Sequence, residues 1–169
     1  MNLLPLIRNI PDFPKPGVIF RDITPLLADA AAFNYAVGKI IEPFAGAKIQ
    51  KVVAIEARGF MFGAVAAHKL GAGFVPIRKK GKLPFKTDFE NCSLEYGSAS
   101  IEVHIDAFSE GEHILLVDDV LATGGTMAAA CHLVERQKAI IVGVSFLCEL
   151  DFLDGRKLLP SPVHSVLNF

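Results

Sequence analysis

Hydrophobic positions near the middle of the chain change from a strand pattern to a helical pattern and back. Residues 51–56 are mostly apolar and predict a strand, and residues 60–70 have the spacing of a helix. A short turn at 57–59 joins the two, and residues 74–78 predict a second strand. This order is typical of a βαβ unit with parallel strands.

A second unit of the same kind follows. Residues 113–117 form an almost continuous apolar run, which is typical of a central parallel strand buried on both faces. The apolar residues after it recur at i, i+3, i+4 and i+7, and they are Met127, Ala130, Cys131 and Val134. Residues 140–146 predict the next strand. We therefore expect an α/β fold with one open, mainly parallel sheet flanked by helices, whose ligand binds beyond the carboxyl ends of the strands.

The segments around these units are less regular. Prolines within 10–17 restrict the backbone and predict an extended lead-in, whereas Asp29 can cap a helix. The apolar positions of that helix are Phe33, Val37, Ile40, Ile41 and Phe44. Residues 79–93 are polar and predict a long loop, and residues 100–105 alternate as a half-buried strand does. We expect one domain over 1–169, with a distinct N-terminal segment at 1–28 and a mobile loop at 79–100.

Composition narrows the class of protein. The chain has 169 residues, of which 51% are hydrophobic and 21% charged, and its net charge is -1. These values favour one folded domain and disfavour binding to nucleic acid. Three cysteines without CxxC spacing, and scattered histidines, give no metal-ligand pattern, so we assign none to a metal and expect reduced thiols in a cytoplasmic protein. No apolar run reaches the roughly 20 residues that span a bilayer, so we expect a soluble protein without a membrane partner.

The strongest chemical signal is the sequence VDDVLATGGT at 117–126, between a buried strand and a helix. The TGGT loop at 123–126 can wrap a phosphate with backbone amides and two hydroxyls. Asp118 and Asp119 can accept hydrogen bonds from ribose hydroxyls and offset positive charge at an anomeric carbon. Paired aspartates or glycines alone more often only shape a turn. The complete motif favours an anion site, and it matches neither a nucleotide-triphosphatase loop nor a dinucleotide-binding fingerprint.

This motif resembles that of the type I phosphoribosyltransferases. Four further blocks, in order, resemble the adenine phosphoribosyltransferases within that group: FPKPGVIFRDITPLL at 13–27, EARGF at 56–60, PIRKKGKLP at 76–84 and SLEYG at 93–97. The loop at 85–92 departs from the usual family sequence. The resemblance implies transfer of the 5-phosphoribosyl group from phosphoribosyl pyrophosphate to N9 of adenine, which yields AMP and diphosphate.

The resemblance also implies roles for single residues. The donor, phosphoribosyl pyrophosphate, would be bound by Ala57, Arg58, Arg78, Lys82, Asp118, Asp119, Ala122, Thr123, Gly124, Gly125 and Thr126. Family members often have a cis peptide at the position of Glu56–Ala57. Lys79 belongs to the same basic cluster with less support, and such a cluster is otherwise a solvated face. Mg²⁺ would arrive with the donor, held by its oxygens and water and by no direct protein ligand.

On the base side, the N-terminal segment would bind adenine. The implied residues are Ile19, Phe20, Arg21 and Leu150, with backbone groups at Ile19 and Arg21 reading the base edge. Core packing is the ordinary alternative for Phe20 and Leu150. Glu95 would exchange a proton with the base, and with Asp118 and Asp119 it completes the implied catalytic set. Tyr96 would order the closed loop, and the family implies a homodimer.

Two alternatives stay open at this stage. A phosphoribosyltransferase for hypoxanthine and guanine, or for orotate, would share the phosphate motif and differ in its base-binding segments. A regulator could keep the phosphate site as a sensor and bind DNA, but it would need a basic face or an added segment, and the sequence has neither.

Overall fold

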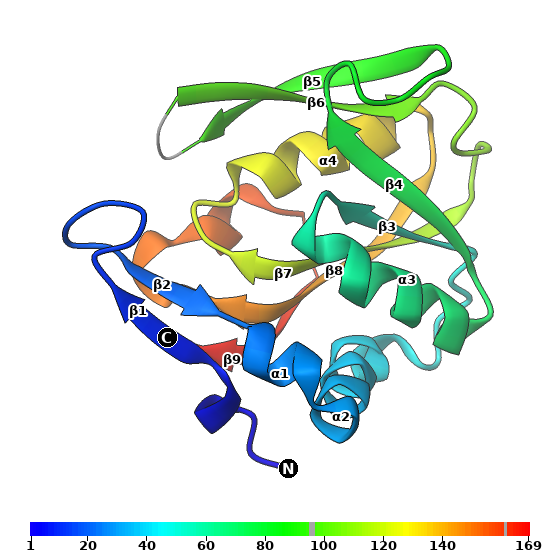
Figure 1. Ribbon diagram of the computed structural model, residues 1–169. Coiled ribbons are helices and arrows are strands. Elements are labelled where there is room, and N and C mark those ends of the chain that lie inside the picture. Colours follow the sequence, from blue (N-terminus) through cyan, green and yellow to red (C-terminus); the bar gives the residue numbers. More distant parts are fainter. Residues whose placement is uncertain (95–96, 161) are drawn as a thin grey trace.

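The central strand β7 (His113–Leu121) buries both of its faces and thereby determines the layering of the molecule. Ile114 and Leu116 pack into one hydrophobic core, and Leu115 and Val117 pack into another on the opposite face. Successive side chains of a strand point to opposite sides, so a continuous apolar run requires cover on both. The computed structural model, which describes residues 1–94, 97–160 and 162–169, has helices on both faces of its main sheet (Figure 1).

Among the described residues, seven strands form this sheet in the order β5-β6-β4-β3-β7-β8-β9. The bounds are β3 Lys51–Ile55, β4 Gly73–Lys79, β5 Thr87–Leu94, β6 Gly97–His104, β8 Ile140–Glu149 and β9 Val163–Asn168. Strands β4, β3, β7, β8 and β9 are parallel to one another, whereas β6 pairs antiparallel with β4 and with β5. The expected open, mainly parallel α/β sheet is confirmed.

Helices α3 (Arg58–Leu70) and α2 (Ala30–Ile41) cover one face, with the short α1 (Thr24–Ala28) beside α2. Helix α4 (Gly125–Arg136) covers the other face. The predicted cap of α2 is confirmed, because Asp29 Oδ1 accepts a hydrogen bond of 2.9 Å from the Ala32 amide. Four short 3-10 helices occur within the described ranges: η1 Leu4–Leu6, η2 Glu42–Phe44, η3 Asp151–Leu153 and η4 Gly155–Leu158.

The N-terminal segment forms more than an extended lead-in. Strands β1 (Arg8–Pro11) and β2 (Ile19–Asp22) pair antiparallel as a separate two-stranded sheet. Figure 1 shows this hairpin beside the carboxyl ends of β7 and β8, and the C-terminal strand β9 reaches the same side. The hairpin is therefore placed where a ligand of the main sheet would bind.

The segment 79–100, which we expected to be a loop, is mostly a β-hairpin of β5 and β6. The polar strand β5 packs on α4, where Arg136 neutralises two of its acidic residues with nitrogen–oxygen distances of 3.0 Å to Asp88 and 2.9 Å to Glu90. The same arginine donates to the backbone carbonyl of Phe89. A local pattern does not reveal such tertiary contacts, so the strand was missed. The mobility of this segment stays a prediction.

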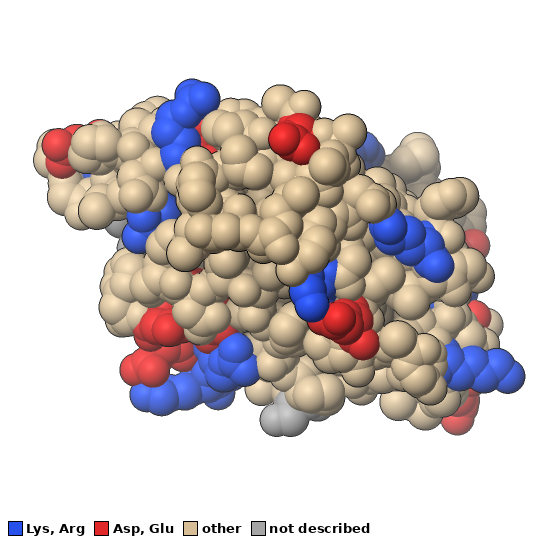
Figure 2. Space-filling model, turned by 90° about the horizontal axis from the view of Figure 1, so that it is seen from below, with Lys and Arg blue, Asp and Glu red and all other residues tan. Residues whose placement is uncertain are grey.

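Charged side chains are dispersed over the surface. On the face drawn in Figure 2, acidic and basic residues are interspersed within a larger area of other residues. Within the described parts of the chain, none of the helices combines the length and apolar character that crossing a bilayer requires.

Candidate active site

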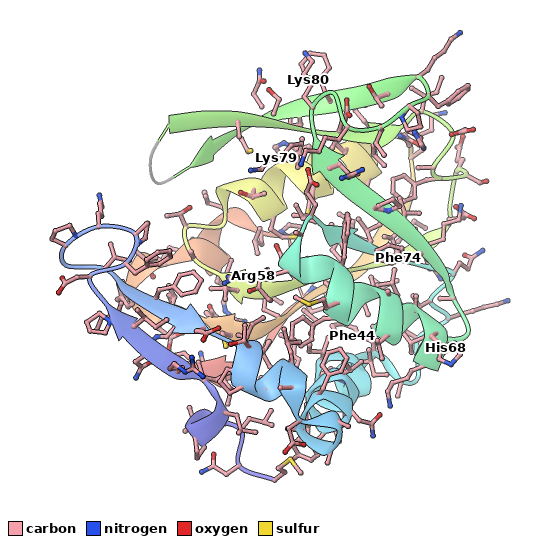
Figure 3. All side chains as sticks on the ribbon, in the orientation of Figure 1. Phe44, Arg58, His68, Phe74, Lys79 and Lys80 are labelled. Carbon is pink, nitrogen blue, oxygen red and sulfur yellow. The ribbon has the colours of Figure 1, made fainter. Side chains whose placement is uncertain are left out.

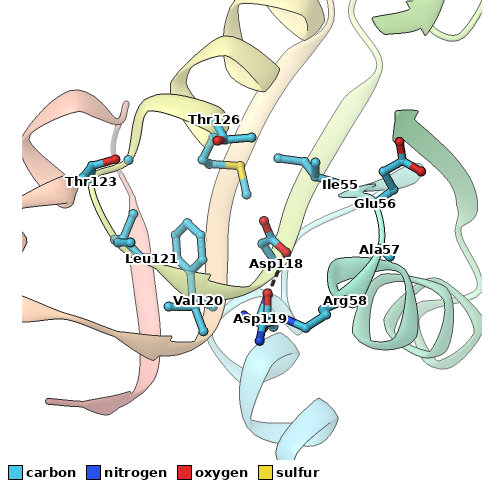
Figure 4. Close-up of a pocket in the computed structure, with 14 residues that line it drawn as sticks. Ile55, Glu56, Ala57, Arg58, Asp118, Asp119, Val120, Leu121, Thr123 and Thr126 are labelled. Carbon is cyan, nitrogen blue, oxygen red and sulfur yellow. Dashed lines mark hydrogen bonds and ion pairs between the residues drawn. The ribbon is translucent and has the colours of Figure 1, made fainter. Parts of the chain in front are cut away.

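After β3 the chain forms β4, which lies on one side of the β3–β7 pair. After β7 it forms β8, which lies on the other side. Because β3 and β7 are neighbours, their carboxyl ends border the switch point at which an open α/β sheet binds its ligands. A cavity of about 250 Å³ lies at this point. The β3–α3 turn, the end of β7 and the loop before α4 form its walls (Figure 4).

Two adjacent carboxyl groups and one guanidinium face this cavity. Nη2 of Arg58, at the start of α3, lies 2.6 Å from Oδ2 of Asp119, which is only 5% exposed. This oxygen has no hydrogen-bond partner among the described residues, so the contact is one of charge and not of hydrogen-bond geometry. Asp118 accepts a hydrogen bond of 2.9 Å from the Asp119 amide. Figure 4 shows the arginine directed at the aspartate pair.

Burial makes negative charge unfavourable at this pair. It raises the pKa of Asp118 well above its ordinary value, and the adjacent Asp119 carboxylate raises it further. Burial also raises the pKa of Asp119, although the Arg58 guanidinium opposes this shift. The site therefore favours a ligand that brings hydroxyl donors or positive charge to the two carboxyl groups.

The loop from Ala122 to Gly124 has the geometry of an anion cradle. Gly124 has a φ of +82°, which glycine adopts without strain, and it is the N-cap of α4. A Cβ at Gly124 would overlap the carbonyl of Gly155, so the close approach of these two backbones also requires glycine. Backbone amides and the Thr123 and Thr126 hydroxyls are available at this helix N-terminus for a phosphate group.

Glu56 organises the basic cluster at the edge of the cavity. Its Oε2 accepts from Arg78 Nη2 at 3.1 Å and lies 3.4 Å from Lys82 Nζ, while Oε1 accepts from the Lys79 amide at 2.6 Å. Burial would raise the pKa of Glu56, but these hydrogen bonds outweigh it, and the pKa is lower than its ordinary value. In Figure 4 the Glu56 side chain points away from the aspartates, and Figure 3 shows Lys79 at the end of β4. One carboxylate thus holds two cationic side chains next to the cavity.

A second cavity, of about 220 Å³, lies between β2 and the segment that follows β8. Gly17, Val18, Ile19, Arg21, Leu150, Phe152 and Leu153 line it. Phe20 lines neither cavity, and its ring faces Arg58, whose guanidinium carbon is 5.0 Å from the ring centre. Arg58 therefore contacts both Asp119 and β2, and Figure 3 shows it between the β1–β2 hairpin and α3.

The family model of the phosphoribosyl transferase domain matches residues 23–159. An adenine phosphoribosyltransferase from Methylococcus capsulatus is 54% identical over 164 residues, which are 96% of this chain and 96% of that protein. One from Acidothermus cellulolyticus is 56% identical over 162 residues, covering 95% of this chain and 92% of the other. This chain belongs to the adenine phosphoribosyltransferase family.

Solved structures of the family have the same fold. The adenine phosphoribosyltransferase of Thermoanaerobacter pseudethanolicus is 50% identical, with a TM-score of 0.95 and coverage of 99% of this chain and 98% of the other. The Saccharomyces cerevisiae protein was solved in complex with D-2,5-dideoxy-2,5-imino-altritol 1,6-bisphosphate and adenine. It is 39% identical, with a TM-score of 0.93 and coverage of 98% and 96%.

Most of the residues that the family resemblance assigned to the donor come together. Those lining the first cavity are Ala57, Arg58, Asp118, Asp119, Ala122, Thr123, Gly124 and Thr126. Gly125 begins α4 directly behind them, whereas Arg78 and Lys82 contact Glu56 and do not line the cavity. Ile19, Arg21 and Leu150 line the second cavity. The peptide between Glu56 and Ala57 is cis, as the family resemblance implies, and Glu95 and Tyr96 lie outside the described residues.

The sequence patterns do not predict several residues of this site. The sequence analysis names Glu56 only for its peptide bond with Ala57. An acidic residue two positions before Arg58 and close to a basic cluster could have indicated a partner for those cations. Gly155 gave no signal, because its contact with the phosphate loop depends on long-range packing. Met127 and Phe146 line the cavity, whereas the sequence pattern predicts Met127 only as an apolar helix position and Phe146 only as the end of a strand.

Proposed function

We propose that this chain transfers the 5-phosphoribosyl group of phosphoribosyl pyrophosphate to N9 of adenine and forms AMP and diphosphate. The observation that carries the proposal is the juxtaposition of a buried carboxyl pair and a helix N-terminal loop at the switch point, beside a second cavity of the size of a small ring system. Full-length similarity to adenine phosphoribosyltransferases supports the choice of base.

In this proposal the first cavity holds the donor. The loop from Ala122 to Thr126 binds the 5-phosphate, and Asp118 and Asp119 accept hydrogen bonds from the ribose hydroxyls. The diphosphate lies toward the β3–α3 turn, where the backbone at Ala57 and the Arg58 side chain contact it. Arg78 and Lys82 turn from Glu56 to the same diphosphate and supply further positive charge.

Adenine binds at the second cavity and extends from it toward Phe20. Phe20 stacks on one face of the base and Leu150 contacts the other, while backbone groups at Ile19 and Arg21 read its edge. Glu95 takes the proton that leaves the base, Tyr96 orders the segment 79–100 in its closed position, and this segment excludes water from the reacting atoms.

The residues present fit Mg²⁺ as an ion that the donor carries. Asp118 and Asp119 supply carboxylate oxygens at the cavity, and one of them, Oδ2 of Asp119, has no hydrogen-bond partner within the described chain. These two residues would contact the ion only through its water ligands, so that it has no direct protein ligand. When bound, Mg²⁺ neutralises part of the charge of the diphosphate and makes it a better leaving group.

The chemistry then depends mainly on position and charge. The bond between the anomeric carbon and the diphosphate oxygen breaks as the bond to N9 forms from the opposite face, through an oxocarbenium-like transition state. Asp118 and Asp119 stabilise the positive charge that develops on the ribose. The two cavities hold the reactants in line, which removes most of the entropic cost of bringing them together.

The setting of the enzyme is part of the proposal. We place it in the cytoplasm, where its three cysteines stay reduced, since Cys92, Cys131 and Cys148 are all buried and unpaired with one another. We also propose a homodimer, as the family resemblance implies. Exposed apolar side chains on α3 and β4, Met61 and Phe74, provide surface of the kind that dimers bury.

A direct assay tests the proposed reaction. The protein is incubated with adenine, phosphoribosyl pyrophosphate and Mg²⁺, and AMP and diphosphate are quantified. Equal amounts of both products are expected, and Asp119→Asn should lower kcat by about 100-fold or more with little change in melting temperature. Lys138→Met, which alters only an exposed ion pair with Glu110, is the matched control. Absence of AMP with the unaltered protein would contradict the proposal.

A further inference from the structure

A short turn after β8 contacts both cavities of the site. Leu150, Phe152 and Leu153 line the second cavity, where the base is proposed to bind. Gly155, only two residues later, packs against the loop that is proposed to bind the 5-phosphate. We name residues 150–155 the bridging turn.

The bridging turn is in direct backbone contact with the end of β7. The Leu150 amide donates a hydrogen bond of 2.9 Å to the carbonyl of Leu121, the residue before the phosphate loop. At the other end, a Cβ on Gly155 would overlap the carbonyl of Ala122, so the two backbones touch. Any movement of the turn therefore displaces the phosphate loop and a wall of the base cavity together.

An ion pair closes the bridging turn at its two ends. Glu149 precedes the turn and Arg156 follows it, and Arg156 Nε donates to Glu149 Oε1 at 3.0 Å while Nη2 donates to Oε2. Ser165 of β9 adds a hydrogen bond of 2.6 Å to the same carboxylate, and Arg156 Nη1 donates to the Val163 carbonyl at 2.7 Å. The Glu149 side chain is only 6% exposed and the Arg156 side chain 47%, so the carboxylate end of this bidentate pair is shielded from water.

A neighbouring ion pair provides an internal comparison. Lys157 contacts Asp154 at 2.7 Å in the same region, but the two side chains are 74% and 66% exposed. Exposed pairs of this kind contribute little, because water screens them and long side chains lose entropy when they pair. The two pairs differ in burial and in bidentate geometry, although they are adjacent in sequence.

We propose that Glu149 and Arg156 are positioning residues that fix the bridging turn and thereby set the spacing between the phosphate loop and the base cavity. Neither residue lines either cavity, so they act through Leu150 and Gly155. The inference rests on the proposed function, because the spacing matters only when one reaction uses both cavities. Their loss weakens the binding of both substrates at once.

The test compares Arg156→Met, Arg156→Lys and the control Lys157→Met at a temperature well below their melting points. Arg156→Met is expected to raise KM for both adenine and phosphoribosyl pyrophosphate, and Kd for ribose 5-phosphate, by roughly tenfold each. Arg156→Lys keeps the charge without the bidentate fork and should recover part of this loss. Lys157→Met should match the unaltered protein in all three constants.

Each outcome has a defined meaning. If the unaltered protein makes AMP and Arg156→Met has the same KM and Kd values as Lys157→Met, the inference is overturned even when its melting temperature falls. If the unaltered protein makes no AMP, the proposed function fails instead. The Kd for ribose 5-phosphate, compared between Arg156→Met and Lys157→Met, then tests alone whether Arg156 positions the phosphate loop. Should Arg156→Met not fold, Ser165→Ala removes one contact of Glu149, and a KM rise of about twofold or more for both substrates is expected; unchanged values would overturn the inference.

Discussion

Arg58 and Asp119 form an ion pair of 2.6 Å across the cavity, between the first turn of α3 and the end of β7. Asp119 is almost fully buried, whereas the Arg58 side chain is 37% exposed and also lies over the Phe20 ring. Arg58 therefore contacts both the carboxyl pair and Phe20, which is proposed to stack on the base, and it is also proposed to bind the diphosphate. This relationship makes the site sensitive to single substitutions.

Replacing Arg58 should weaken donor binding strongly. Arg58→Met is expected to lower kcat/KM for phosphoribosyl pyrophosphate by about 10- to 100-fold, because a charge-assisted contact to the diphosphate is lost and Asp119 keeps no counter-charge. Arg58→Lys should recover only part, since lysine lacks the planar fork. Steady-state kinetics with Lys138→Met as the control measures both effects, and equal kcat/KM in all variants would remove Arg58 from the site.

Asp118→Asn should make the protein more stable and less active. The raised pKa of Asp118 means that its contribution to stability is fully present below the ordinary pKa of 3.8 and is lost as pH rises through the folded-state pKa. Asparagine does not ionise, so the melting temperature of the variant should exceed that of the unaltered protein at neutral pH and the gap should close in acid. Thermal denaturation from pH 4 to pH 8 without substrates is the measurement. A gap that does not depend on pH would argue against a buried charge.

Two glycine substitutions should affect different properties, Gly59→Ala the activity and Gly38→Ala the stability. A Cβ at Gly59 would lie 2.5 Å from Asp118 Oδ1, so Gly59→Ala displaces the carboxyl group and should reduce kcat by at least about tenfold. Gly38, inside α2, has nothing within 4 Å of an added Cβ, and Gly38→Ala should stabilise the protein by about 0.4–1 kcal/mol with unchanged kinetics. Urea denaturation and initial rates test the pair, and equal rates for both variants would contradict the site geometry.

Glu102 should control the acid stability of the segment that contains Lys82. Burial would raise its pKa, but hydrogen bonds from backbone amides, including those of Leu83 and Lys82, and from Thr87 lower it below 4.5. This stability is present above pH 4.5 and is lost as pH falls through the lowered pKa.

Glu102→Gln should therefore cost about 1 kcal/mol at neutral pH, because a neutral amide oxygen accepts more weakly than a carboxylate from the Lys82 and Leu83 amides. The difference from the unaltered protein should shrink in acid. Urea denaturation at pH 7 and pH 4 measures it, and an equal difference at both values would exclude the carboxylate as the cause.

The sequence was sufficient for the parts of the fold that depend on local periodicity. The two βαβ units were predicted because β3, β7 and α4 have uninterrupted apolar patterns. The phosphate loop was predicted because its glycines and hydroxyls are consecutive. These elements already define the switch point and hence the location of the first cavity.

The missed parts depend on contacts between distant segments. Strand β5 is polar and is stabilised by Arg136. Strand β9 is not predicted by its own sequence pattern and is identified only by its pairing with β8. The assignment of Leu150 to the base came from family resemblance alone, because its position opposite β2 results from packing of the bridging turn. The Glu149–Arg156 pair likewise has no local signature, since its burial is set by β9.

A competition experiment between free bases measures directly which base the protein converts to its nucleotide. The protein receives limiting phosphoribosyl pyrophosphate, Mg²⁺ and equal concentrations of adenine, hypoxanthine, guanine and orotate, and the nucleotides formed are identified by mass spectrometry. AMP is expected to be the dominant nucleotide, with diphosphate released in equal amount. Another nucleotide as the main product would contradict the assignment of the second cavity to adenine.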